Sequence, residues 1–106
     1  MPKYLIAANY VGEGIKGLLK EGGSGRSEAI EKLVKSVGGT VEGIYYAFGD
    51  TDIFIIVEMP DNASVAALSL VVNASGAATA KTVVLMTPEE MDEAARELEF
   101  EKAADL

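Results

Sequence analysis

The order of strand-like and helix-like segments constrains the fold of this chain more than any other sequence feature. Four apolar runs of strand length, most of them rich in β-branched or aromatic residues, lie at residues 4–11, 40–48, 53–58 and 78–86. Segments with an apolar stripe at helical spacing follow the first and the third of these runs. The pattern therefore predicts the order strand, helix, strand, strand, helix, strand.

Capping residues mark the ends of the predicted helices. We assign Ser24 as the N-cap of the first long helix. Residues 38–39 are both glycine and are expected to end it, because glycine adopts the left-handed conformation at a helix C-terminus without steric strain. Asp61 is the expected N-cap of the second long helix. Thr87, with Glu90 three residues later, forms the pattern of a capping box and predicts a third helix.

Two consecutive strand-helix-strand halves are typical of the ferredoxin-like fold. We therefore predict an α+β fold of this type, with a four-stranded antiparallel sheet in the order 4-1-3-2 and a C-terminal helix. Residues 1–106 fit one domain of a common size. Both long helices are expected on one face of the sheet, which leaves the opposite face uncovered within one chain.

The uncovered face is predicted to be apolar. Strand side chains alternate between faces, and in the first strand Leu5 and Ile6 point opposite ways although both are apolar. In the second strand we expect Val41, Gly43 and Tyr45 to share a face. Because a large exposed apolar surface favours association, we expect a second copy, the third helix, or both to cover it. The protein is predicted to be a homo-oligomer, with a dimer as the first expectation.

The formal net charge of −8 is concentrated near the C-terminus. Residues 89–106 carry eight acidic and two basic side chains, which account for −6 of that charge. An acidic surface repels phosphate backbones and anionic membranes, so neither nucleic acid nor a membrane is an expected partner. No apolar run reaches the roughly 20 residues that span a bilayer, and no signal segment follows Met1. We expect a cytoplasmic protein.

The chain contains no cysteine and no histidine. These absences remove disulfides, cysteine nucleophiles, the commonest zinc ligands and the usual general base. Asp50 and Asp52 could contact a hard cation, but without further clustered oxygen ligands they are better explained as turn residues. We expect no metal and no cofactor.

Residues 12–17 match the pattern G-x-G-x-x-G between a strand and a helix. That pattern occurs in dinucleotide-binding loops. This chain is too short for a doubly wound dinucleotide domain, and the hairpin between its second and third strands makes the sheet antiparallel. We therefore favour a glycine-rich connection between strand and helix.

Five polar residues are candidates for binding a small ligand. Asn9 interrupts an apolar strand, so its amide needs a partner, which a ligand or the backbone of a neighbouring loop could supply. Arg26 and Lys81 could hold an anionic group or remain solvated surface charges. Tyr45 and Tyr46, like the other two tyrosines, could line a pocket or pack in the core or an interface. No catalytic residue can be named.

Several segments together resemble one family. The sequence Gly-Asp-Thr-Asp at 49–52 precedes an apolar strand and the sequence Glu-Met-Pro-Asp at 58–61. Further similar segments lie at 17–24, 38–39, 73–76 and 85–89. In these features the chain resembles the GYD-domain family, although Thr51 stands where that family usually carries tyrosine. The resemblance implies a ferredoxin-like domain related to the dimeric α/β-barrel proteins. Those relatives include cofactor-free oxygenases, haem-degrading enzymes, lactone isomerases and stress-induced proteins, so no reaction is implied.

Two functions remain. The favoured one is a non-enzymatic homo-oligomeric protein that is either structural or binds a small hydrophobic or anionic molecule in the cleft between the sheet and its cover. The alternative is a cofactor-independent enzyme of the dimeric α/β-barrel type, similar to an oxygenase or isomerase, in which Asn9 and the tyrosines position a substrate. Without histidine or cysteine, such an enzyme would need a carboxylate, lysine or tyrosine base with a strongly shifted pKa.

Overall fold

The computed structural model describes residues 1–98 and contains four strands and three helices within them. The strands are β1 (Lys3–Tyr10), β2 (Thr40–Tyr46), β3 (Ile53–Glu58) and β4 (Ala78–Leu85), and the helices are α1 (Glu13–Ser36), α2 (Asn62–Ala74) and α3 (Pro88–Leu98). This order confirms the predicted ferredoxin-like α+β fold with a C-terminal helix. None of these helices combines the length and the apolarity needed to cross a membrane.

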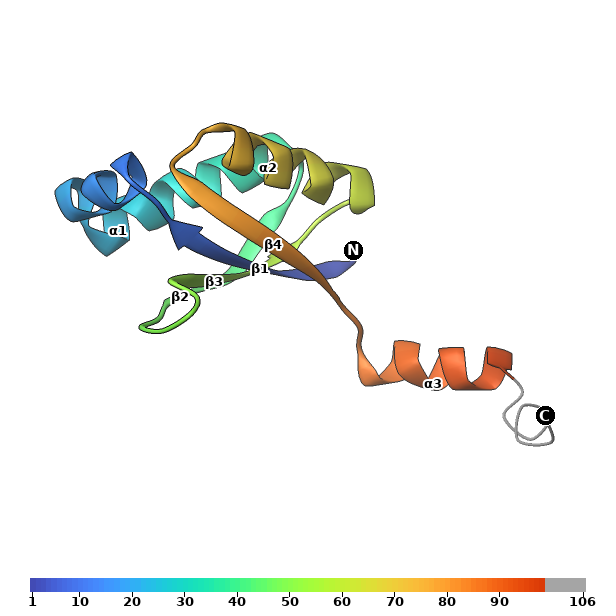
Figure 1. Cartoon of the computed structure of the whole chain (residues 1–106). Helices are drawn as coiled ribbons and strands as arrows, with labels where there is room; N and C mark the ends of the chain where they lie inside the picture. Colours follow the sequence, from blue (N-terminus) through green and yellow to red (C-terminus); the bar gives the residue numbers. More distant parts are fainter. Residues whose placement is uncertain (99–106) are drawn as a thin grey trace.

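The four strands form one antiparallel sheet in the order β2-β3-β1-β4, as predicted. Helices α1 and α2 lie together on one face of it (Figure 1). Ile6 lies opposite Ile55, which in turn lies opposite Ile44, so these three share the face that the helices cover. Leu5 and Ile56 lie opposite each other on the other face.

The core lies between the sheet and the two helices. Its buried side chains are Tyr4, Ile6, Ala8, Val34, Ile53, Ile55, Val57, Met59, Val65 and Leu68. Burying one large side chain of this kind contributes about 1.5–3 kcal/mol. The hydroxyl of Tyr4 donates a hydrogen bond to the Asn62 side chain at the start of α2, so the polar end of this buried residue has a partner.

A β-bulge between Val41 and Gly43 changes the predicted faces of β2. Val41 lies opposite Val57 and packs against the core, whereas Gly43 lies opposite Ile56 on the bare face. A bulge inserts one extra residue into a strand, so residues two apart no longer share a face. The prediction that Val41 shares a face with Gly43 and Tyr45 is therefore wrong.

Helix α1 contains a break at Gly22, where φ is 77° and ψ is 168°. Glycine adopts such a conformation without the strain that a Cβ atom would cause. The break falls two residues before Ser24, the predicted N-cap, and Ser24 itself lies inside the helix. Gly38, with φ at 84°, ends α1 as predicted.

The two other predicted caps are present. The Asp61 carboxylate accepts a hydrogen bond from the backbone N–H of Ser64 at 2.8 Å. The Thr87 hydroxyl oxygen accepts one from the backbone N–H of Glu90 at 3.1 Å, and the Glu90 carboxylate accepts one from the backbone N–H of Thr87 at 3.3 Å. These reciprocal bonds form a capping box.

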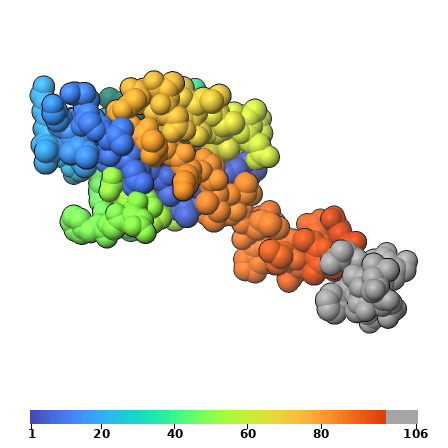
Figure 2. Space-filling model, in the orientation of Figure 1, coloured from blue at the N-terminus to red at the C-terminus, as the bar shows by residue number. Residues whose placement is uncertain are grey.

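Helix α3 projects away from the sheet and from α1 and α2 (Figures 1 and 2). The radius of gyration is 16.9 Å, whereas a compact domain of this length has about 13 Å. Within residues 1–98, no other element packs closely against α3. A second copy or the third helix is expected to cover the bare face. The third helix of the same chain does not cover it (Figure 1). The acidic side chains of Glu99, Glu101 and Asp105 lie outside the described residues.

Gly14 and Gly17, one turn apart in α1, should respond oppositely to the same substitution. A Cβ atom at Gly14 would overlap the carbonyl oxygen of Ala77, so Gly14→Ala should lower the free energy of unfolding by roughly 1–3 kcal/mol. A Cβ atom at Gly17 would meet nothing within 4 Å, so Gly17→Ala should raise it by about 0.5–1 kcal/mol. Urea unfolding measures both values, and equal effects would contradict the described packing.

The cap at Asp61 predicts a dependence of stability on pH. Hydrogen bonds from the backbone and side chain of Ser64 lower the pKa of the Asp61 carboxyl below its usual value. A group with a depressed folded-state pKa contributes stability above its unfolded-state pKa and loses that contribution as pH falls through the folded-state value. Asp61→Asn keeps a capping oxygen but does not titrate. Its melting temperature should therefore fall less than that of the unmodified chain between about pH 5 and pH 2. Parallel declines would contradict this assignment.

Candidate functional site

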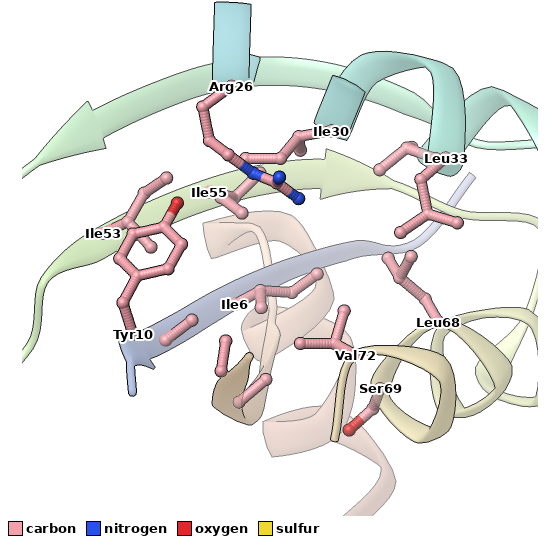
Figure 3. A pocket seen from close by; sticks show the side chains of 14 residues that line it. Ile6, Tyr10, Arg26, Ile30, Leu33, Ile53, Ile55, Leu68, Ser69 and Val72 are labelled. Carbon is pink, nitrogen blue, oxygen red and sulfur yellow. The ribbon is translucent and has the colours of Figure 1, made fainter. Parts of the chain in front are cut away.

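A partly enclosed cavity of about 70 Å³ lies between α1, α2 and the helix-covered face of the sheet. Figure 3 shows the side chains around it. The labelled ones are Ile6, Tyr10, Arg26, Ile30, Leu33, Ile53, Ile55, Leu68, Ser69 and Val72. The walls are mainly aliphatic, and the polar side chains among the lining residues are Tyr10, Arg26 and Ser69. The cavity thus combines an apolar interior with very few polar contacts.

Arg26 extends from α1 into this cavity (Figure 3). Its Nε atom is buried and has no hydrogen-bond partner within the described part of the chain. Its Nη1 atom lies 3.5 Å from a carboxylate oxygen of Glu21, longer than the about 2.7–2.9 Å of a strong charge-assisted hydrogen bond. The side chain is 35% exposed. The guanidinium therefore lies at the mouth of the cavity, with one of its donors inside.

Tyr10, at the end of β1, lines both this cavity and a neighbouring open groove. Burial, and to a lesser extent the nearby Tyr46, raise the pKa of the Tyr10 hydroxyl, while Arg26 partly offsets that rise. The hydroxyl therefore stays protonated near neutral pH and can donate a hydrogen bond.

The open groove has a volume of about 390 Å³ and lies beside the first half of α1. Its lining residues are Tyr10, Ile15, Leu18, Gly23, Tyr46, Ala47, Phe48 and Asp52. The Tyr46 hydroxyl donates a hydrogen bond to the Gly23 carbonyl oxygen at 2.9 Å. This bond ties the end of β2 to the residue that follows the break in α1.

Asp52 joins the β2–β3 hairpin to the end of β1. The Asn9 side-chain oxygen accepts a hydrogen bond from the backbone N–H of Asp52 at 2.9 Å. The Asp52 carboxylate accepts one from the backbone N–H of Tyr10, also at 2.9 Å. The Asn9 amide oxygen thus finds its partner in a neighbouring loop, and Asp52 has a structural role. No group of three or more acidic residues that could hold a metal ion occurs in residues 1–98.

The five candidate ligand residues fall on two sides of the sheet. Arg26 and Tyr46 lie on the helix side, near the break in α1. The strand pairing places Asn9, Tyr45 and Lys81 on the bare face. A single ligand therefore cannot contact all five within one chain. No sequence pattern indicates that Arg26 and Tyr10 line the same cavity, because their proximity depends on how α1 folds back over β1.

The bare face is apolar at its centre. Leu5, Ala7, Phe54 and Ile56 are half-buried there, on the two central strands. Farther out, Tyr45 on β2 and Val83 on β4 are 65% and 48% exposed. At one end, the Lys3 ammonium lies 2.9 Å from a Glu42 carboxylate oxygen and 3.7 Å from one of Glu58. The charged groups at this end therefore form ion pairs. The side chains of the two central strands in the middle of the face carry no charge, and Lys81 on β4 lies beside Ala7 at their flank.

The sequence profile of the GYD domain matches residues 4–95 of the chain. This match extends from β1 into α3 and covers most of the chain. No curated protein and no solved structure matches the chain significantly. On the strength of the profile match, and in agreement with the resemblance noted in its sequence, the chain belongs to the GYD domain family.

Proposed function

We propose that the protein is a non-enzymatic dimer that binds a small molecule between its sheet and helices. The observation that carries the binding proposal is the apolar cavity with the unpartnered Nε of Arg26 in its wall. Protein interiors are otherwise closely packed, and a buried donor without a partner costs about 1–3 kcal/mol. A ligand that fills the cavity and accepts a hydrogen bond from Arg26 would remove both the unfilled space and the cost of the unpaired donor.

The same cavity favours binding over catalysis. A cofactor-independent enzyme needs a group that can accept a proton near neutral pH. Tyr10 and Arg26 are the ionisable residues among those that line the cavity. Burial raises the pKa of Tyr10, and an arginine side chain stays protonated in proteins. Both groups are therefore donors, which suits recognition of an acceptor rather than proton abstraction.

The bare sheet face supports the dimer. A two-fold interface brings the same patch of each copy together, so the patch must be compatible with itself. The central side chains Leu5, Ala7, Phe54 and Ile56 meet this condition, because they are apolar and carry no charge that a second copy would oppose. Covering them with a second copy would remove apolar surface from water, at about 25 cal/mol per Å².

Helix α3 supplies a second contact in the proposed dimer. Met91, Ala94 and Ala95 lie at helical spacing on one side of it, and all three are exposed. Acidic residues occupy much of the rest of the helix surface. Because α3 projects beyond its own sheet (Figure 2), its apolar side is available to another copy of the chain. We propose that α3 packs against that copy.

A charge on the bare face should separate the dimer. Leu5→Glu places a carboxylate at the centre of the proposed interface, where an unpaired charge would have to be buried. The variant should have the mass of one chain by light scattering at micromolar concentration, whereas the unmodified chain should have twice that mass. Leu19→Glu is the matched control, since Leu19 is 81% exposed on α1 and the dimer should persist. A monomeric unmodified chain, or a dimeric Leu5→Glu variant, would contradict the proposal.

Filling the cavity should abolish ligand binding. A ligand present at about ten times its dissociation constant stabilises the native state by about 1.4 kcal/mol, which raises the melting temperature by several degrees. We expect some members of a panel of small apolar acids, alcohols and amines to have this effect. Ala80→Leu adds three carbons at the cavity wall and should remove the ligand-induced rise. Ala66→Leu, on the exposed side of α2, should retain it. Binding to the Ala80→Leu variant with unchanged affinity would place the ligand elsewhere.

A further inference from the structure

The free edge of the Arg26 guanidinium has the shape that a carboxylate recognises. Glu21 lies near Nη1, while Nε is buried without a partner among residues 1–98. In a guanidinium group the Nε and Nη2 hydrogens point in the same direction and form a fork. A carboxylate can accept both hydrogens side by side, an arrangement that adds geometric specificity to the charge attraction. The edge that Glu21 leaves free is thus a potential anion site.

The surroundings of this edge favour a negative ligand atom over a neutral one. Tyr10 also lines the cavity, and its raised pKa keeps its hydroxyl available as a second donor. The other lining residues are aliphatic apart from Ser69, so they screen the arginine charge less than water does. A carboxylate oxygen of Glu21 lies 3.5 Å from Nη1 of the guanidinium, and the Asp52 carboxylate accepts a hydrogen bond from the Tyr10 backbone N–H. Neither carboxylate is among the residues that line the cavity.

The size of the cavity limits the apolar part of the ligand. An engineered apolar cavity of about 150 Å³ holds benzene. The cavity beside Arg26 has about half that volume, about 70 Å³, so it suits a tail of roughly three or four carbons. Side chains such as Ile6, Leu33 and Val72 would surround this tail (Figure 3). Because Arg26 lies at the mouth, the tail would enter first and the polar head would remain beside the guanidinium.

We infer that the ligand is a short-chain carboxylate, with its tail in the cavity and its head on the Nε edge of Arg26. This inference rests on the proposed binding function and names the chemical class that the site selects. The tail is held by removal of apolar surface from water, and the head by Arg26 with help from Tyr10. Selectivity follows from both parts, since an alcohol lacks the charge and acetate lacks the tail.

Calorimetric titration of the full chain tests this inference. The probes are sodium pentanoate, pentan-1-ol and sodium acetate. Pentanoate should bind at least about tenfold more tightly than either of the others, because a charge-assisted hydrogen bond contributes a factor of about ten or more. Arg26→Met should lose at least about tenfold in pentanoate affinity and should change pentanol affinity little. Arg96→Met removes the chain's other arginine, which is exposed on α3, and should leave both affinities unchanged.

The outcomes separate the inference from the function on which it rests. Equal binding of pentanol and pentanoate, or full pentanoate affinity in Arg26→Met, would overturn the carboxylate assignment while leaving a small-molecule site in place. Failure of every acid, alcohol and amine to bind the unmodified chain would overturn the binding function as well. If Arg26→Met fails to fold, the comparison of pentanoate with pentanol on the unmodified chain still tests whether the site selects a carboxylate.

Discussion

Strands β1 and β3 send apolar side chains to both faces of one sheet, and each face therefore needs a cover. The two β-α-β halves place α1 and α2 on the same side, so they bury residues such as Ile6 and Ile55. Leu5 and Ile56 lie one residue along on the same strands and point to the other face, which no helix within residues 1–98 covers. Since α3 projects away from the body, the chain contains no second cover among its described elements. The cavity beside Arg26 and the proposed dimer interface are consequences of these two unequal faces.

Hydrogen bonds at one end of the sheet position the residues around the cavity mouth. Asp52 holds the hairpin to β1 through the backbone N–H of Tyr10 and the side chain of Asn9. Tyr46 holds the other side of the hairpin to α1 at Gly23, next to the helix break and shortly before Arg26. Tyr10 and Arg26 therefore belong to segments that are fixed by separate hydrogen bonds. Preorganisation of this kind reduces the conformational entropy that the protein would lose when a ligand binds.

Local chemistry explains which parts of the fold could be predicted. The succession of strands and helices along the chain, and the caps at Asp61 and Thr87, depend on patterns within a few residues, and all of them are present. The bulge between Val41 and Gly43 leaves no pattern in the sequence, because apolar residues lie on both sides of it and fit either alternation. The sequence predicts an N-cap at Ser24, whereas the structure has a break at Gly22 within a longer helix, since several glycines lie within this stretch and only tertiary packing selects one.

The sequence predicts only part of the candidate site, because the site depends on packing between distant segments. The charge of Arg26 predicts a contact with an anion, but its position beside Tyr10 depends on the path of α1 over the sheet. Only polarity links Arg26 with Asn9, Tyr45 and Lys81, and strand parity places these three on the bare face. A cavity between layers leaves no sequence pattern of its own, since its lining residues are ordinary core residues on several elements.

A crystal structure of the full chain grown with pentanoate tests the central claim, that one face of the sheet binds a ligand and the other binds a second copy. The account predicts pentanoate density between α1 and α2, with its carboxylate on the Nε edge of Arg26, and a second chain covering Leu5 and Phe54. Pentanoate bound on the bare face, or an empty cavity together with a bare face open to solvent, would contradict it.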